Sequence, residues 1–162
     1  MTVLVTGGAG FIGSHMTLEL LAAGETVVVL DNLSTGFAAA VPKSVPLVIG
    51  DFGDEALVAK IIKDHDVREV IHFAAKIVVP ESIADPVAYY VNNTAKALAL
   101  IGCVAECGVE RFIFSSTAAV YGDPESSPVR EDTRLSPLSP YGRSKLMVEW
   151  ILQDISRAHN MN

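Results

Sequence analysis

Two side chains near the end of the sequence could together move a proton. Tyr141 and Lys145 stand one helical turn apart in the segment SPYGRSK, so in a helix they share a face. A tyrosine of ordinary pKa, ~10, is a poor base at neutral pH, but a nearby ammonium group favours the phenolate. Such a pair suits removal of a proton from a hydroxyl while hydride leaves the same carbon. Without further context, a surface tyrosine beside a solvated lysine is the ordinary interpretation.

A run of hydroxyl residues forms a second candidate feature. The segment SSTAAVYG, which begins at Ser115, directly follows the apolar run RFIF. Ligands of open α/β sheets bind at the carboxyl ends of strands, so a hydroxyl such as that of Thr117 could hold a substrate oxygen there. The next two residues, Ala118 and Ala119, carry methyl groups and cannot transfer protons.

Glycines after the first apolar run predict a binding site for a dinucleotide. In TGGAGFIGSH, Gly7, Gly10 and Gly13 allow a tight turn, close approach of a pyrophosphate and close packing of helix on strand. The helix that follows would direct N–H groups and a partial positive charge at the phosphates. Asp31 closes the second apolar run at about the 20-residue spacing expected for a carboxylate that binds the ribose hydroxyls. That carboxylate would repel a 2′-phosphate, and DNLSTG contains no arginine, so NAD(H) is favoured over NADP(H). A glycine-rich turn without a ligand is the alternative.

The elements that must position these residues alternate between strand and helix. Continuously apolar runs are typical of strands buried on both faces of a parallel sheet, which predicts an α/β doubly wound sheet, the Rossmann fold. A stretch from 123 to 140 lacks periodicity and is expected to be a long loop. The expected strands are Thr2–Val5, Thr26–Leu30, Pro46–Ile49, Val70–Phe73 and Arg111–Ser115, and the expected helices are Phe11–Ala23, Asp54–Lys63, Asp85–Gly108 and one from Ser139 past Trp150.

Composition narrows the function classes. The chain of 162 residues fits one domain, and its net charge of -7 argues against binding to nucleic acid or an anionic membrane surface. No apolar run is long enough to span a bilayer, and no signal peptide is apparent. Cys103 and Cys107 are expected to be small core residues, a usage that fits a reducing cytoplasm. The four histidines and two cysteines show no spacing typical of metal ligands, so no metal site is expected.

Five ordered motifs carry a resemblance to a known family. TGGAGFIG, DNLSTG, HFAA, FSSTAAVYG and SPYGRSK are similar in sequence and order to those of the extended short-chain dehydrogenase/reductase family, and most similar to its nucleotide-sugar 4-epimerases. This resemblance implies interconversion of UDP-glucose and UDP-galactose through a 4-keto intermediate, with NAD held as a prosthetic group.

The resemblance also implies roles for individual residues. Tyr141 would be the base, Lys145 would bind the nicotinamide ribose, and Thr117 would bind O4 of the sugar. The residues implied at the cofactor are Gly7, Gly10, Phe11, Ile12 and Gly13 at the pyrophosphate, Asp31, Asn32, Ser34, Thr35 and Gly36 at the adenosine ribose, Asp51 and Phe52 beside the adenine, and Phe73, Ala74, Ala75, Asn92, Ser115, Tyr141 and Lys145 along the rest of the dinucleotide.

Departures from the family pattern limit what the resemblance implies. Epimerases of this kind often carry a lysine where this chain has Ile77, so that contact is not transferred. Related dehydratases carry an acid pair where this chain has Ala118 and Ala119, which disfavours 4,6-dehydration. Another epimerase, a decarboxylase or a reductase acting on nucleotide sugars stays an alternative, as does a non-catalytic module that senses NAD(H).

The length of family members bears on the domain prediction. They are much longer than this chain, which implies that 1–162 is an NAD-binding domain that is incomplete at its C-terminal end and lacks the domain that binds the sugar nucleotide. Such a part could lack turnover by itself. Family members also commonly pair two long helices from each subunit, which here would be the helices that begin at Asp85 and Pro140.

Overall fold

The computed structural model describes residues 1–162 and contains one parallel sheet of five strands. The strand order is β3-β2-β1-β4-β5, as a doubly wound fold requires, and all four strand pairs are parallel. The strands are β1 (Thr2–Thr6), β2 (Thr26–Asp31), β3 (Leu47–Ile49), β4 (Val67–His72) and β5 (Arg111–Phe114). The helices are α1 (Phe11–Ala22), α2 (Glu55–His65), α3 (Val79–Ala84), α4 (Pro86–Tyr89), α5 (Lys96–Glu106) and α6 (Pro140–His159).

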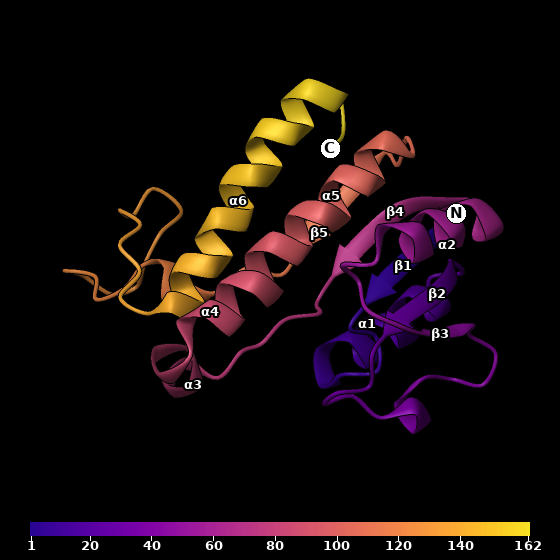
Figure 1. The fold of residues 1–162 in the computed structure, drawn as a ribbon, viewed down its shortest axis with the longest axis horizontal. Helices are drawn as coiled ribbons and strands as arrows, with labels where there is room; N and C mark the ends of the chain where they lie inside the picture. The colour runs from indigo at the N-terminus through magenta and orange to yellow at the C-terminus, as the bar shows by residue number, and fades with distance from the viewer.

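Apolar side chains project from both faces of the sheet. Along β1, Leu4 packs into a cluster with residues of α2, α5 and α6, whereas Val3 and Val5 join a second cluster with side chains of α1. Both faces are therefore covered, which explains why the strands are apolar along their length. Figure 1 shows α5 and α6 side by side, and the two helices are in contact.

The predicted strands are confirmed, and β4 begins earlier than expected. The first half of β4 contains the charged residues Arg68 and Glu69, which interrupt the run of apolar residues by which the strand was predicted. Both are accommodated at the amino end of the strand, because Arg68 pairs with Asp66 at 2.9 Å and Glu69 pairs with Arg111 of β5 at 3.8 Å.

The long helix predicted from Asp85 to Gly108 is interrupted. It consists of α4, the π-helical turn η2 (Tyr90–Ala95) and α5, and it is preceded by the short helix α3 that the sequence did not reveal. A π turn places one extra residue in a helical turn, and it is here that Asn93 is turned inward and buried. Residues 121–139 form neither helix nor strand, in agreement with the predicted loop.

The two cysteines differ in their surroundings. Cys103 is buried, as expected, but the same expectation is wrong for Cys107, which is exposed at the end of α5, and both thiols are free. No helix of the structure combines the length and the apolar character needed to cross a membrane.

Candidate active site

The glycine-rich loop joins β1 to α1 and lies against the end of β4. Gly7 has a φ of 73°, and a Cβ on it would lie 2.6 Å from the backbone nitrogen of Ala74. A Cβ on Gly13 would lie 2.2 Å from the carbonyl oxygen of Gly7. Gly10 is the N-cap of α1 and offers no side chain to cap it, so the first N–H groups of the helix keep no intrahelical partner. The N-terminal end of α1 is therefore suited to binding an anion.

Asp31 connects the end of β2 to the glycine-rich loop. Its carboxylate accepts one hydrogen bond from the backbone N–H of Ala9 at 2.9 Å and another from Leu33 at 2.8 Å. A carboxylate has about four acceptor positions, so two of them stay available for other donors. The residues after it fold back over the loop, since the N–H of Phe37 donates to the carbonyl of Ala9 at 2.9 Å. The segment Asn32, Ser34, Thr35 and Gly36 therefore borders the same cradle.

Asp51 and Phe52, predicted to flank the adenine, point in different directions. The Asp51 carboxylate forms an ion pair with Lys96 of α5 and accepts a 2.8 Å hydrogen bond from the N–H of Gly53. Burial raises the pKa of Asp51, but the Lys96 and Gly53 hydrogen bonds outweigh it and the pKa is lowered. The Phe52 ring is buried in the core, edge-on to His72. The ring of Phe52 is thus not presented at the edge of the sheet.

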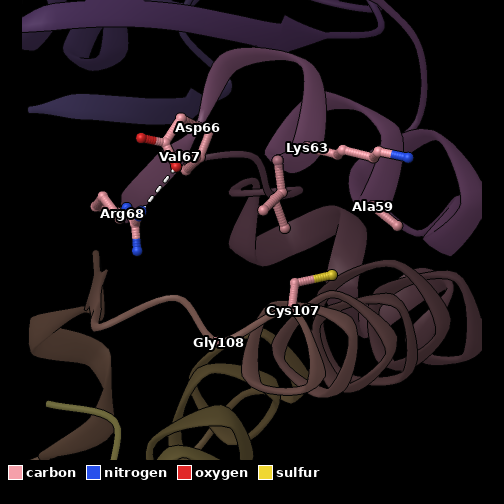
Figure 2. Close-up of a pocket in the computed structure, with 8 residues that line it drawn as sticks. Ala59, Lys63, Asp66, Val67, Arg68, Cys107 and Gly108 are labelled. Atoms are coloured by element: carbon pink, nitrogen blue, oxygen red, sulfur yellow. Dashed lines mark ion pairs between the residues drawn. The ribbon is translucent and has the colours of Figure 1, made fainter.

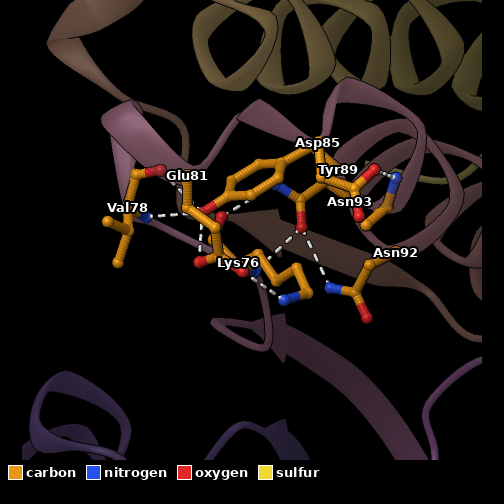
Figure 3. A network of polar contacts seen from close by, with 8 residues as sticks. Lys76, Val78, Glu81, Asp85, Tyr89, Asn92 and Asn93 are labelled. Atoms are coloured by element: carbon orange, nitrogen blue, oxygen red, sulfur yellow. Dashed lines mark hydrogen bonds and ion pairs between the residues drawn. The ribbon is translucent and has the colours of Figure 1, made fainter. Parts of the chain in front are cut away.

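The segment after β4 is held by a polar network around η2 (Figure 3). The Asn93 amide accepts from the N–H of Lys76 and donates to its carbonyl, both at 2.9 Å, and also donates to Ser144 of α6 at 3.2 Å. The predicted cofactor residue Asn92 is half-buried and donates to Asn93 at 3.0 Å. These bonds fix the backbone that follows Phe73, Ala74 and Ala75.

Tyr89 provides a second anchor for the same segment. Its hydroxyl accepts from the N–H of Val78 at 2.8 Å and lies 2.7 Å from the carbonyl of that residue and 3.1 Å from Glu81. Its ring also meets the Tyr141 ring edge-on, with centroids 6.4 Å apart. The anchor of the loop therefore contacts the predicted base directly.

Tyr141 and Lys145 lie in the first turns of α6, beside the end of β5. Ser139 caps this helix by accepting from the N–H of Gly142, and a proline occupies its first turn. A Cβ on Gly142 would lie 2.7 Å from the carbonyl oxygen of Ala119, so the helix presses against the turn η3 (Ala118–Val120). Thr117 caps that turn, which brings its hydroxyl group to the same corner as the start of α6.

The ammonium group of Lys145 is buried. The residue is 3% exposed, and its Nζ lies 4.4 Å from the centroid of the Phe114 ring. Burial lowers the pKa of Lys145 to about 8, while the carboxylate of Glu149 acts in the opposite direction. His72, whose ring stacks on that of Phe114 with centroids 5.9 Å apart, is fully buried, and burial together with Lys145 lowers its pKa to about 3. The imidazole is therefore neutral, and its Nδ1 forms a 2.6 Å hydrogen bond with Oγ1 of Thr6.

The three hydroxyl residues after β5 have separate surroundings. The backbone of Ser115 continues the sheet, with its N–H donating to the carbonyl of His72 at 3.2 Å. Ser116 hydrogen-bonds Glu149 of α6, and Thr117 caps η3. Thr117 thus lies at the same corner as the start of α6, which carries Tyr141 and Lys145, whereas Ser116 is hydrogen-bonded further along that helix.

Two cavities lie outside this corner. One, of about 400 Å³, is lined by Lys63, Asp66, Arg68 and Cys107 and opens near the start of β4 (Figure 2). The other, of about 480 Å³, lies between β5 and the second half of α6. Ligands of this fold class bind at the carboxyl ends of strands, so the glycine loop and the Tyr141 corner, rather than the cavity at the start of β4, are the candidate site.

Sequence reasoning missed four residues that organise the site. The ring of Phe114 packs on Lys145, Glu149 acts on its pKa, and Asn93 and Tyr89 hold the loop after β4. Two consecutive asparagines in a predicted helix were a visible signal for Asn93, because asparagine is disfavoured in helix interiors. The others are ordinary in sequence, because aromatic and acidic residues of this kind usually belong to the core or the solvated surface.

Comparisons with known proteins agree on one family. Residues 3–162 match the NAD dependent epimerase/dehydratase family. The chain is 52% identical over 159 residues to a UDP-glucose 4-epimerase of Azospirillum brasilense, covering 98% of this chain and 46% of that protein. It superposes with a TM-score of 0.96 on a UDP-glucose 4-epimerase from Brucella ovis in complex with NAD, at 41% identity over 99% of this chain and 49% of the other. A dTDP-glucose 4,6-dehydratase from Streptomyces venezuelae with NAD bound gives a TM-score of 0.92 and 34% identity, covering 99% of this chain and 53% of that one. The chain spans about half the length of the curated relatives it matches.

Proposed function

The chain belongs to the NAD dependent epimerase/dehydratase family, and from this premise we propose that it is the NAD-binding and catalytic part of a UDP-glucose 4-epimerase. The observation that carries the proposal is the placement of Tyr141 and Lys145 one turn apart on α6. The start of this helix contacts η3, which Thr117 caps, and Lys145 packs on Phe114 at the carboxyl end of β5. Residues 1–162 form the NAD-binding domain in this proposal, and the sugar nucleotide is held largely by a further region.

The residues present fit NAD. A Cβ at Gly7 or Gly13 would clash with backbone atoms, so glycine lets the loop pack closely against its neighbours. The first turn of α1, which no side chain caps, can then receive the pyrophosphate. Asp31 has acceptor positions left for ribose hydroxyls, and its charge disfavours the 2′-phosphate of NADP. We propose that the other residues predicted at the cofactor line the dinucleotide, and that Phe52 contributes through its backbone because its ring is buried.

Bound NAD supplies reversible transfer of hydride to and from C4 of the sugar. Tyr141 accepts the proton of the O4 hydroxyl when C4 is oxidised and returns it when the 4-keto sugar is reduced on its other face. Thr117 holds O4 through its hydroxyl group. Lys145 binds the nicotinamide ribose and supplies a positive charge on the same face of α6 as Tyr141. Because the sugar leaves in the oxidation state in which it arrived, no external oxidant is consumed.

A 4,6-dehydratase is the second candidate because such an enzyme has the same fold. Dehydration needs a further base and acid at the sugar, and the positions after Thr117 are Ala118 and Ala119, which cannot transfer protons. This difference favours epimerisation.

The assembly and location are also part of the proposal. Val87, Val91 and Leu98 are exposed along the interrupted helix, and Met147 and Trp150 are exposed on α6, which supports a homodimer formed through these helices. The free thiols of Cys103 and Cys107 fit a reducing cytoplasm.

Nucleotide analysis of the purified protein, in the form its gene encodes, tests the proposal. Denaturation should release NAD, and the protein should interconvert UDP-galactose and UDP-glucose without added NAD. Tyr141→Phe should keep the dinucleotide and lose the interconversion, whereas Tyr90→Phe, on the neighbouring helix, should keep both. A Tyr141→Phe protein with unchanged activity would contradict the assignment, and formation of a 4-keto-6-deoxy sugar would identify a dehydratase.

A further inference from the structure

The ammonium group of Lys145 is supported by an aromatic ring. Its Nζ lies 4.4 Å from the centroid of Phe114, at a residue that is 3% exposed. No carboxylate lies within 4.0 Å of this nitrogen, since every ion pair in the structure involves other cations. A desolvated cation over a ring face is attracted by the quadrupole of the ring. The ring of Phe114 is thus the group that compensates the buried charge.

A carboxylate stands close by but is turned to another partner. Glu149 follows Lys145 by one helical turn on α6, a spacing at which a lysine and a glutamate can pair. Instead, the hydroxyl of Ser116 donates a hydrogen bond to the Glu149 carboxylate. Phe114 and Ser116 are two residues apart along the end of β5, so both face α6, and both line the 480 Å³ cavity with Glu149.

We propose that Phe114 and Ser116 are positioning residues for Lys145, the first by carrying the ammonium group on its ring face and the second by holding Glu149 away from it. The inference deepens the proposed function, because it rests on Lys145 being the residue that binds the nicotinamide ribose. If the ammonium were paired with Glu149, its N–H groups would donate to that carboxylate. On a ring face, the same N–H groups stay available to donate to ribose hydroxyls and to the oxygen of Tyr141.

Other charged groups at the site do not replace this arrangement. Burial lowers the pKa of His72 on β4 to about 3, so that imidazole carries no charge at neutral pH. Burial also lowers the pKa of Lys145 to about 8, with Glu149 acting in the opposite direction. The protonation of Lys145 near neutral pH therefore depends on burial, which disfavours the ammonium, and on two groups that favour it, the ring beneath it and the Glu149 carboxylate.

The two residues can be tested by variants with opposite expected effects. The protein is labelled with ¹³C at the ε carbon of lysine and titrated by NMR without NAD, and Lys145→Met identifies the resonance. Phe114→Leu removes the ring and should lower the pKa of Lys145 by about one unit. Ser116→Ala frees Glu149 to pair with Lys145 and should raise it by about half a unit.

Matched variants separate positioning from packing. Phe114→Tyr keeps the ring, and the adjoining cavity has space for the hydroxyl, so the titration should match the wild type. Ser156→Ala removes a hydroxyl from the same cavity two turns beyond Glu149 and should also leave the titration unchanged. An unchanged Lys145 titration in Phe114→Leu, or an unchanged or lowered one in Ser116→Ala, would overturn the proposal.

NAD affinity as a function of pH connects the arrangement to the site. Binding should weaken as pH rises through the pKa of Lys145, and this loss should begin about one pH unit lower in Phe114→Leu. A wild-type protein that binds no NAD would refute the proposed function while the titration shifts still stand. Shifts that are absent although NAD binds would refute the positioning role alone.

Discussion

The backbone N–H of Ala9 donates a 2.9 Å hydrogen bond to the carboxylate of Asp31, so that the end of β2 and the glycine-rich loop form one unit. The same carboxylate accepts from Leu33 at 2.8 Å. A single side chain thus shapes the cradle and places a negative charge beside the glycine-rich loop.

Asp31→Asn should separate the two nicotinamide cofactors. The amide keeps one acceptor oxygen but loses the charge, so we expect NAD affinity to fall by about 10- to 100-fold, the loss of a charge-assisted hydrogen bond. NADP affinity should fall less or rise, because repulsion of its 2′-phosphate is removed. Calorimetric titration with both cofactors measures the ratio, and Asp123→Asn in the exposed loop is the control. Equal losses for both cofactors would contradict the assignment.

Gly13→Ala should destabilise the fold as well as the cradle. Its Cβ would lie 2.2 Å from the carbonyl oxygen of Gly7, a backbone atom that cannot give way, so we expect a loss of about 2 kcal/mol or more in the free energy of unfolding. Gly102→Ala, within α5, meets nothing within 4 Å and should instead gain roughly 0.5–1 kcal/mol from helix propensity. Urea denaturation of the two variants should therefore give shifts of opposite sign.

Local patterns in the sequence predicted much of this fold. Glycine spacing located the loop between β1 and α1, and the one-turn spacing of Tyr141 and Lys145 placed both on α6, because each signal lies within a few residues. Long-range contacts gave no such signal. Asn93 meets Ser144 across 51 positions, and the Lys145 ammonium lies over the ring of Phe114 on another element. Contacts of this kind depend on how α5, α6 and β5 pack, which periodicity does not specify.

Tyr89→Phe should weaken the segment after β4. It removes a hydroxyl that accepts from the N–H of Val78 at 2.8 Å, and we expect a loss of about 1–2 kcal/mol in the free energy of unfolding. Tyr90→Phe is the matched control, because the hydroxyl of the adjacent tyrosine has no hydrogen-bond partner in the protein. Hydrogen exchange at the amide of Val78 should accelerate only in Tyr89→Phe. Equal stability of the two variants would show that water replaces the Tyr89 hydroxyl without loss.

His72 should make the fold sensitive to acid. Its pKa is about 3 in the folded protein and ~6.5 when unfolded, so between these values only the unfolded state binds the proton. The free energy of unfolding should therefore decrease as pH falls from 6.5 toward 3, by on the order of 4 kcal/mol from this group. His72→Gln keeps a hydrogen-bonding group for Thr6 that does not titrate. The variant should therefore be less stable than wild type at neutral pH, and this difference should shrink as pH falls toward 3. For His159→Gln, at an exposed site, the difference in free energy of unfolding from wild type should not change over this pH range.

Lys145 should make the free energy of unfolding depend on pH in the alkaline range. Burial lowers its pKa from 10.5 to about 8, so between these values the folded protein has released a proton that the unfolded chain still holds. Stability from this group therefore rises with pH across that window, by about 3 kcal/mol. Lys145→Met buries no charge, so at pH 7 its free energy of unfolding should exceed that of wild type. By pH 10.5 the free energy of unfolding of wild type should have risen by about 3 kcal/mol relative to that of the variant.

Chemical denaturation at a series of pH values measures this difference, with the exposed Lys43→Met as the control. A constant difference between wild type and Lys145→Met would mean that the ammonium is not desolvated in the folded protein. A narrowing difference would mean that the fold keeps a cation at Tyr141 at a cost in stability, which is expected of a group retained for binding or catalysis rather than for packing.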